Sequence, residues 1–315
     1  MDTGALTSLL RCWLEGQPPP PASDETALLT AARHHRLAGT LYHIGTPLRE
    51  SNATQARAAW ADNLGAHLLR VETLHRIWPT RAPPPLVFKG ADVAENLLDD
   101  PGARQARDLD LLVPPAAWPE LARHLGRAAD AVEHPRHAHL AGDPPLAVGL
   151  RFGPVLIELH AHPWPPHRGG PDGWFFSARG RPGRLGDTDV IYPRPEDRLL
   201  LWLGNQAKGA FTTDLADWLD LALILKTCGP GPATLAARTG LERPWQVARR
   251  RLGRVGLASP LPGGPAARAI DALLPDPTAA RSEPRAAHLI KALLAPAEAW
   301  PGLAMRLAVA RRGGP

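Results

Sequence analysis

Three acidic side chains in two apolar stretches could together hold metal ions. Asp108 and Asp110 lie two positions apart in a stretch that alternates apolar and acidic residues, a pattern typical of a β-strand. Both carboxylates then leave the same face, where they repel each other unless a divalent cation lies between them. Glu158, in a later apolar stretch, could supply a third carboxylate. Because Mg²⁺ prefers carboxylate oxygens and substrate phosphates, these residues predict a site for two magnesium ions.

A second group of residues, upstream of the aspartates, could bind phosphate. The apolar run 86–88 is followed by Gly90 and a helical pattern, which predicts a strand, a glycine turn and a helix. Backbone N–H groups at such a helix start, around Gly90 and Ala91, attract a phosphate, and glycine lets it come close. Lys89 adds a positive charge that can pair with a triphosphate.

Arg104 is a further candidate for the phosphate-binding group, because it lies four positions before Asp108. The competing interpretation is a salt bridge from Arg104 to Asp99 or Asp100. The acid pair itself could also lie on the solvent-exposed face of a half-exposed strand. The glycine turn upstream and the third acid downstream favour a functional site over that interpretation.

The elements that would position these residues fall into three regions. Residues 1–82 show helical periodicity, 83–194 mix strand and helix patterns, and 195–315 return to helical periodicity. Strands are expected at 86–88, 108–113, 146–152, 155–160 and 189–192. The sequence therefore predicts an α+β fold, in which a small mixed β-sheet core is flanked by N-terminal and C-terminal helical regions.

Composition limits the classes of function. The chain has 315 residues and 44% hydrophobic content, and no apolar run approaches the ~20 residues that span a bilayer, so no membrane role is expected. The first residues carry an acid at Asp2 and no basic region before the apolar stretch, unlike a secretory signal. Cys12 and Cys228 are the only cysteines and lie far apart, which argues against a disulfide framework and favours a cytoplasmic location.

The net charge of +5 gives no strong signal for nucleic-acid binding. Only four of the 36 basic residues are lysines, and the arginines are scattered rather than grouped with aromatic residues. The abundance of Arg, Ala and Pro is more typical of a GC-rich genome.

The stretch VFKGADVAENLLDDPGARQARDLDLLV, followed later by IELH, resembles the uncharacterised nucleotidyltransferase family of bacteria, within the DNA-polymerase-β-like nucleotidyltransferase superfamily. LLTAARHHRLAGTLY resembles the family's preceding helical segment, and PEDRLLLWL and LADWLDLALIL resemble its following helices. The resemblance covers roughly residues 25–230. It implies that Asp108, Asp110 and Glu158 are metal ligands and that Gly90 lies against a triphosphate.

The reaction implied by this resemblance is Mg²⁺-dependent transfer of a nucleoside monophosphate from an NTP to an acceptor hydroxyl, with release of pyrophosphate. Glu158 could also act as a base or orient that hydroxyl. The acceptor could be a small molecule, a peptide, a protein or an RNA end.

One departure from the wider superfamily concerns the phosphate loop. Many relatives carry Gly-Gly or Gly-Ser where this chain has Gly90-Ala91. A serine hydroxyl contact is therefore absent, and Lys89 is the residue that could compensate. The main alternative is accordingly a catalytically inactive relative that binds a nucleotide or a partner protein.

A metal-dependent hydrolase is the remaining alternative. His160 and His162 would share a strand face with Glu158, and neutral imidazoles suit zinc. No distant ligand matches them, so His160 is better explained as a hydrogen-bond partner of Glu158. The sequence also lacks G-x-x-x-x-G-K-[ST], G-x-G-x-x-G and G-x-S-x-G motifs, which argues against P-loop, Rossmann-type and serine-hydrolase chemistry.

Overall fold

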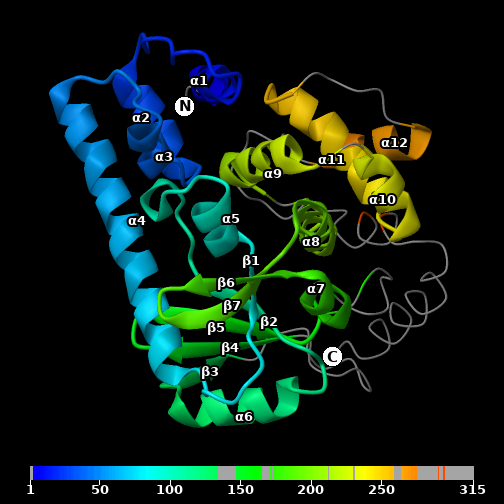
Figure 1. Cartoon of the computed structure of the whole chain (residues 1–315). Helices are drawn as coiled ribbons and strands as arrows, with labels where there is room; N and C mark the ends of the chain where they lie inside the picture. The colour runs from blue at the N-terminus through cyan, green and yellow to red at the C-terminus, as the bar shows by residue number, and fades with distance from the viewer. Residues whose placement is uncertain are drawn as a thin grey trace, which may run out of the picture.

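The computed structural model has an α+β architecture in which helices surround one mixed sheet (Figure 1). This confirms the fold class expected from the sequence. The structure describes residues 3–133, 147–164, 171, 173–211, 213–229, 231–258, 264–274, 290 and 294.

Seven strands form the sheet in the order β3-β4-β5-β2-β1-β7-β6 within the described residues. Strand β2 lies at the centre, antiparallel to β1 and parallel to β5, and β1 is parallel to β7. The remaining neighbours, β3 with β4, β4 with β5 and β6 with β7, are antiparallel. The strand bounds are β1 Leu86–Phe88, β2 Leu109–Leu112, β3 Ala131–Glu133, β4 Ala147–Phe152, β5 Val155–His160, β6 Arg181–Leu185 and β7 Thr188–Tyr192.

Helices precede, interrupt and follow the sheet. The long helix α4 runs from the N-terminal helices down the side of the sheet, and α6 covers one of its faces (Figure 1). The bounds before the sheet are α1 Thr3–Leu14, α2 Glu25–His34, α3 Ala38–His43 and α4 Glu50–Ile77. Within the sheet region they are α5 Gly90–Asn96, η1 Pro101–Ala103, α6 Trp118–Ala128 and α7 Gly173–Arg179. After it they are α8 Pro195–Lys208, α9 Leu215–Thr227, α10 Pro232–Arg238, α11 Glu242–Val255 and α12 Pro265–Leu273.

The two faces of β2 belong to different parts of the core, as its alternating sequence predicts. Leu109 and Leu111 pack in one apolar cluster with Leu121 and Leu125 of α6. Leu112, on the opposite face, packs in a second cluster. Asp110 shares that second face, so it points toward the helical layer formed by α5, α8 and α9.

The second apolar cluster joins helices from both ends of the described chain. It contains Leu6 of α1 and Leu28 of α2 together with Leu199 of α8 and Trp218 of α9. The helices before and after the sheet therefore share one core, and their packing fixes the side chains above the central strands. The division of the chain at residues 82 and 194 stays a prediction.

Gly204 provides a test of this packing, because it lies in α8 directly against the buried indole ring of Trp164. A Cβ at position 204 would come within 2.2 Å of Trp164 Cε3. We expect Gly204→Ala to lower the free energy of unfolding by about 1–3 kcal/mol, although alanine favours the helix.

The matched control is Gly65→Ala, in the middle of α4, where a Cβ would meet nothing within 4 Å. That variant should raise the free energy of unfolding by roughly 0.5–1 kcal/mol. Urea unfolding measures both changes. Equal shifts in the two variants would show that Trp164 does not constrain position 204.

Candidate active site

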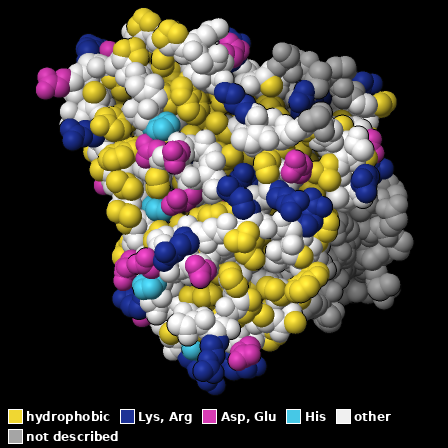
Figure 2. All heavy atoms as spheres, viewed as in Figure 1, with side chains coloured by type: hydrophobic (Ala, Val, Ile, Leu, Met, Phe, Trp, Pro, Cys, Tyr) yellow, Lys and Arg dark blue, Asp and Glu magenta, His cyan; other side chains and the backbone are white. Residues whose placement is uncertain are grey.

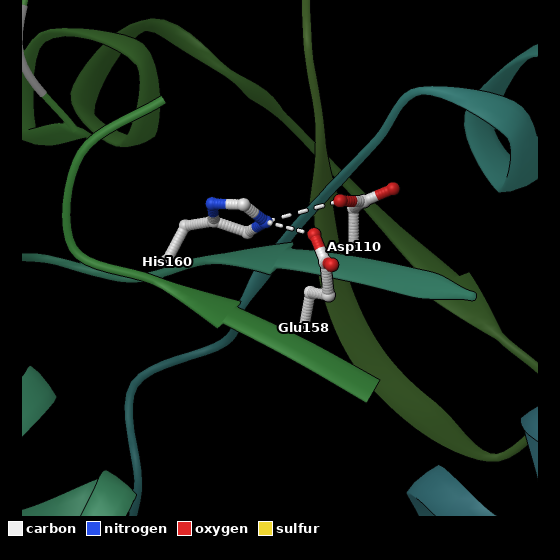
Figure 3. Close-up of side chains that lie close together, drawn as sticks. All are labelled: Asp110, Glu158 and His160. Atoms are coloured by element: carbon white, nitrogen blue, oxygen red, sulfur yellow. Dashed lines mark hydrogen bonds and ion pairs between the residues drawn. The ribbon is translucent and has the colours of Figure 1, made fainter. Parts of the chain in front are cut away.

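The pairing of β2 with β5 brings together two of the three predicted acids. The strands are parallel, with Asp110 opposite Glu158 and Leu112 opposite His160. Figure 3 shows the side chains of Asp110, Glu158 and His160 pointing toward one another. One possible ligand atom from each of these three residues lies within 4.8 Å of the others. The three side chains are therefore close enough to share one metal ion.

His160 holds the two carboxylates in place. Its Nε2 lies 3.0 Å from Asp110 Oδ1 and 3.3 Å from Glu158 Oε2. Since both partners are carboxylates, which accept hydrogen bonds, Nε2 carries a proton and donates. The imidazole is buried edge-on against the ring of Phe88, with 5.2 Å between centroids. The hydrogen bond expected between His160 and Glu158 is present, and the bond to Asp110 is an addition that the sequence did not indicate.

Lys89 also reaches the carboxylates. It lies between β1 and α5, and its Nζ forms an ion pair with Asp110 Oδ1 and lies 3.7 Å from Glu158 Oε2. Burial alone would lower the pKa of Lys89, but the negative charges of Asp110 and Glu158 outweigh burial and raise it. Lys89 is therefore charged at neutral pH, and in this conformation it faces carboxylates.

Glu158 is ionised in this environment. The hydrogen bond from His160 holds its pKa below the usual range, with burial opposing and the charge of Lys89 assisting. An ionised carboxylate is the form that binds a metal.

Asp108 lies beside this group but is not one of its three members. It lies just before β2 and lines the same cavity as Asp110. Burial, together with the nearby charge of Asp110, raises the pKa of Asp108 to about 6. The structure thus brings Asp110 and Glu158 together with His160, whereas metal binding by Asp108 stays a prediction.

A cavity of about 180 Å³ opens beside the carboxylates, between the sheet and helices α8 and α9. Its lining includes Lys89, Gly90, Arg107, Asp108 and Asp110. Figure 2 shows Lys and Arg side chains gathered over α8 on this face of the molecule. The cavity therefore places positive charge close to the acidic group, as a phosphate-bearing substrate would require.

The two small residues of the predicted phosphate loop have different surroundings. Gly90 lines the cavity, and a Cβ there would lie 3.0 Å from the Cβ of Ala106, so the close approach of that loop favours glycine. The side chain of Ala91 is buried in the apolar cluster of the opposite face and does not line the cavity. Any contact of Ala91 with a nucleotide would therefore come from its backbone.

Arg104 forms buried ion pairs instead of projecting freely into the cavity. Its Nε and Nη2 donate to the two oxygens of Asp220 at 2.9 and 2.8 Å, and Nη2 is also 3.2 Å from Asp217. Arg104 does not pair with Asp99 or Asp100, the nearby acids that the sequence offered as partners. Asp100 instead accepts hydrogen bonds from Trp60 and from the backbone of Gly102.

Arg104 belongs to a buried charge network of two arginines and three aspartates. Arg36, between α2 and α3, donates to both oxygens of Asp214 at 2.6 and 2.8 Å and to Asp217 at 3.0 Å. Asp217 thus joins the two arginines. This network ties the N-terminal helices, the segment before β2 and helix α9 together at one side of the cavity.

Sequence reasoning missed a second buried pair in the cavity wall. Asp92 of α5 accepts hydrogen bonds from Arg198 of α8 at 2.6 and 2.9 Å. Burial raises the pKa of Asp92 to about 6, although Arg198 acts in the opposite direction. In the sequence, the only indication of this pair was a charged residue among the apolar residues of each helix.

The raised pKa of Asp92 predicts how stability changes with pH. The unfolded carboxyl has a pKa near 3.9, so between about pH 4 and 6 the folded state retains a proton that the unfolded state has lost. The free energy of unfolding should therefore fall as pH rises through this range, by about 2–3 kcal/mol from Asp92.

Asp92→Asn should weaken this pH dependence, because the amide does not titrate. Urea unfolding of both proteins between pH 4 and 7 measures the difference. Asp108 titrates in the same pH range in both proteins, so its contribution cancels. The difference between the two slopes of stability against pH therefore comes from Asp92. Parallel curves for the two proteins would contradict the assignment.

The zinc interpretation finds no support in the described part of the chain. The group of possible ligands found there is Asp110, Glu158 and His160, and His162 is not a member. With two carboxylates and one histidine, this donor set differs from the histidine-rich site that the hydrolase alternative assumed.

Fold and site together define an α+β protein with a carboxylate group beside a cation-lined cavity. The chain belongs to the family described as uncharacterised nucleotidyltransferase, whose sequence profile matches residues 21–250. Membership supports a general nucleotidyl-transfer activity and a nucleoside triphosphate as substrate. A comparison with curated proteins found no match. None of the helices in the described residues has the length and apolar character needed to cross a membrane.

Proposed function

We propose that this protein is a magnesium-dependent nucleotidyltransferase that moves a nucleoside monophosphate from an NTP to an acceptor hydroxyl and releases pyrophosphate. The observation that carries the proposal is the β2–β5 register, which sets Glu158 opposite Asp110 beside the cavity. Family membership gives the reaction class. The strand–glycine–helix unit before the acid pair supports placement in the DNA-polymerase-β-like superfamily, and a cytoplasmic location is part of the same proposal.

The donor set fits a hard divalent cation. Asp110 and Glu158 supply carboxylate oxygens, Asp108 lies next to them, and magnesium completes its shell with water and substrate phosphates. When bound, such ions lower the pKa of the attacking hydroxyl and neutralise charge on the leaving pyrophosphate.

The residues of the chain have separate roles in the proposed reaction. Lys89 and the Gly90 backbone hold the phosphates, and Glu158 orients the acceptor hydroxyl by accepting its hydrogen bond. The hydroxyl oxygen forms a bond to the α-phosphorus, and the bond from that phosphorus to the bridging oxygen breaks. Pyrophosphate leaves, and the hydroxyl proton is released to solvent.

The test combines binding with turnover. Calorimetry with Mg²⁺ and each NTP measures binding, and a pyrophosphate-release assay with radiolabelled NTP and fractionated cell extract measures transfer and identifies the acceptor. Labelled acceptor together with pyrophosphate supports the proposal. Binding without release from any fraction would favour the alternative of a catalytically inactive nucleotide-binding protein.

A further inference from the structure

Lys89 lies against the two carboxylates of the candidate metal site. Its ammonium group is paired with Asp110 and lies 3.7 Å from Glu158. Both carboxylates belong to the group of possible metal ligands. An ammonium group and a divalent ion held against the same carboxylates repel each other, so each weakens the binding of the other.

The backbone of Lys89 has an unusual conformation. Its φ of 59° and ψ of −135° lie in a region that L-residues rarely adopt. The residue is nevertheless a lysine and not the glycine that this conformation favours. In this conformation the side chain of Lys89 pairs with Asp110, and its Nζ lies over the ring of Phe88.

We infer that Lys89 is the counter-ion of the Asp110–Glu158 pair when no metal is bound, and that its ammonium group moves from the carboxylates to the nucleotide phosphates when metal binds. The inference rests on the proposed function, since it takes these carboxylates as the metal site. Lys89 lines the cavity that would receive the triphosphate, so a new partner for its charge lies within reach.

One consequence is that metal and nucleotide assist each other's binding. A nucleotide that draws Lys89 away exposes the carboxylates, and a metal that displaces Lys89 frees it for phosphate. Coupling of this kind is reciprocal and typically amounts to about 5- to 150-fold in affinity. Metal should therefore bind weakly to the nucleotide-free protein and more tightly in the presence of an NTP analogue that cannot react.

The experiment measures Mn²⁺ affinity of the nucleotide-free full chain by calorimetry, without any assay of activity. Lys89→Met removes the competing charge and should raise Mn²⁺ affinity by about tenfold, while reducing the effect of a non-hydrolysable NTP analogue on that affinity. Lys89→Gln, which keeps a hydrogen-bond donor for Asp110, serves as the second variant if Lys89→Met does not fold.

Arg107→Met is the matched control. Arg107 lines the same cavity next to Asp108, and it forms no ion pair with any residue that the structure describes. Its loss removes one positive charge without freeing a carboxylate, so Mn²⁺ affinity should change by less than about threefold. An equal rise in both variants, or no rise in either Lys89 variant, would overturn the inference.

Asp110→Asn separates this inference from the proposed function. Mn²⁺ binding that is lost in Asp110→Asn places the metal at the proposed site, and the Lys89 variants then decide the role of Lys89 alone. If wild type and Asp110→Asn bind Mn²⁺ equally in the presence of the non-hydrolysable NTP analogue, or if neither binds it there, the proposed function itself fails.

Discussion

Asp110→Asn should reduce the rate of pyrophosphate release by about 10³-fold or more, the largest effect expected of any single substitution in this protein. The carboxylate is 2% exposed and is contacted by both His160 and Lys89. The amide has the same shape but no charge, so it cannot hold a divalent cation beside Glu158. Release of pyrophosphate from radiolabelled NTP, measured with the acceptor fraction, checks the result.

The control for this substitution is Asp189→Asn. The Asp189 side chain on β7 is 84% exposed, so its loss should leave both activity and stability within experimental error. Thermal unfolding of Asp110→Asn must also show one cooperative transition, which separates lost chemistry from lost structure. An Asp110→Asn rate above a tenth of the wild-type rate would refute the assignment of this carboxylate.

Arg104→Met should lower the free energy of unfolding by about 3–5 kcal/mol, the largest stability effect we expect. The substitution leaves Asp217 and Asp220 buried close together with only Arg36 to compensate them. Removing one partner of a buried pair costs more than the pair contributes, because the remaining charge stays desolvated. Urea unfolding at neutral pH measures the loss.

An exposed ion pair supplies the comparison. Arg184 pairs with Asp187 at the surface, where the two side chains are 62% and 78% exposed. Arg184→Met should cost less than about 1 kcal/mol, because solvent screens such pairs. If the two arginine variants lose similar stability, the network around Arg104 contributes no more than a surface contact does.

The sequence predicted the local elements of the site well. The alternation around Asp110 identified both the strand and the face on which its carboxylate lies, and the hairpin of β4 and β5 was expected from two apolar stretches. Strands β3 and β6 were not predicted. Strand β3 is a three-residue exposed strand, and β6 contains Pro182 and Gly183, so neither shows a clear period of two.

Contacts between distant segments could not be predicted from spacing. The sequence offered Asp99 and Asp100 as partners for Arg104, whereas the partner is Asp220, 116 positions away. Likewise, nothing local shows that Lys89 folds back onto Asp110, because that contact depends on an unusual backbone conformation. The closeness of Asp110 and Glu158 is established by strand register, while their action as metal ligands stays a prediction.

The two-arginine, three-aspartate network has a consequence for how sequences in this family diverge. Its members lie between residues 36 and 220, entirely inside the matched stretch, and each depends on a partner from another segment. Replacing one charge alone is penalised, so relatives should gain or lose these charges in pairs. Position 36 should covary with 214, and 104 with 220, and an alignment of the family would show these pairs as correlated columns rather than as separately drifting sites.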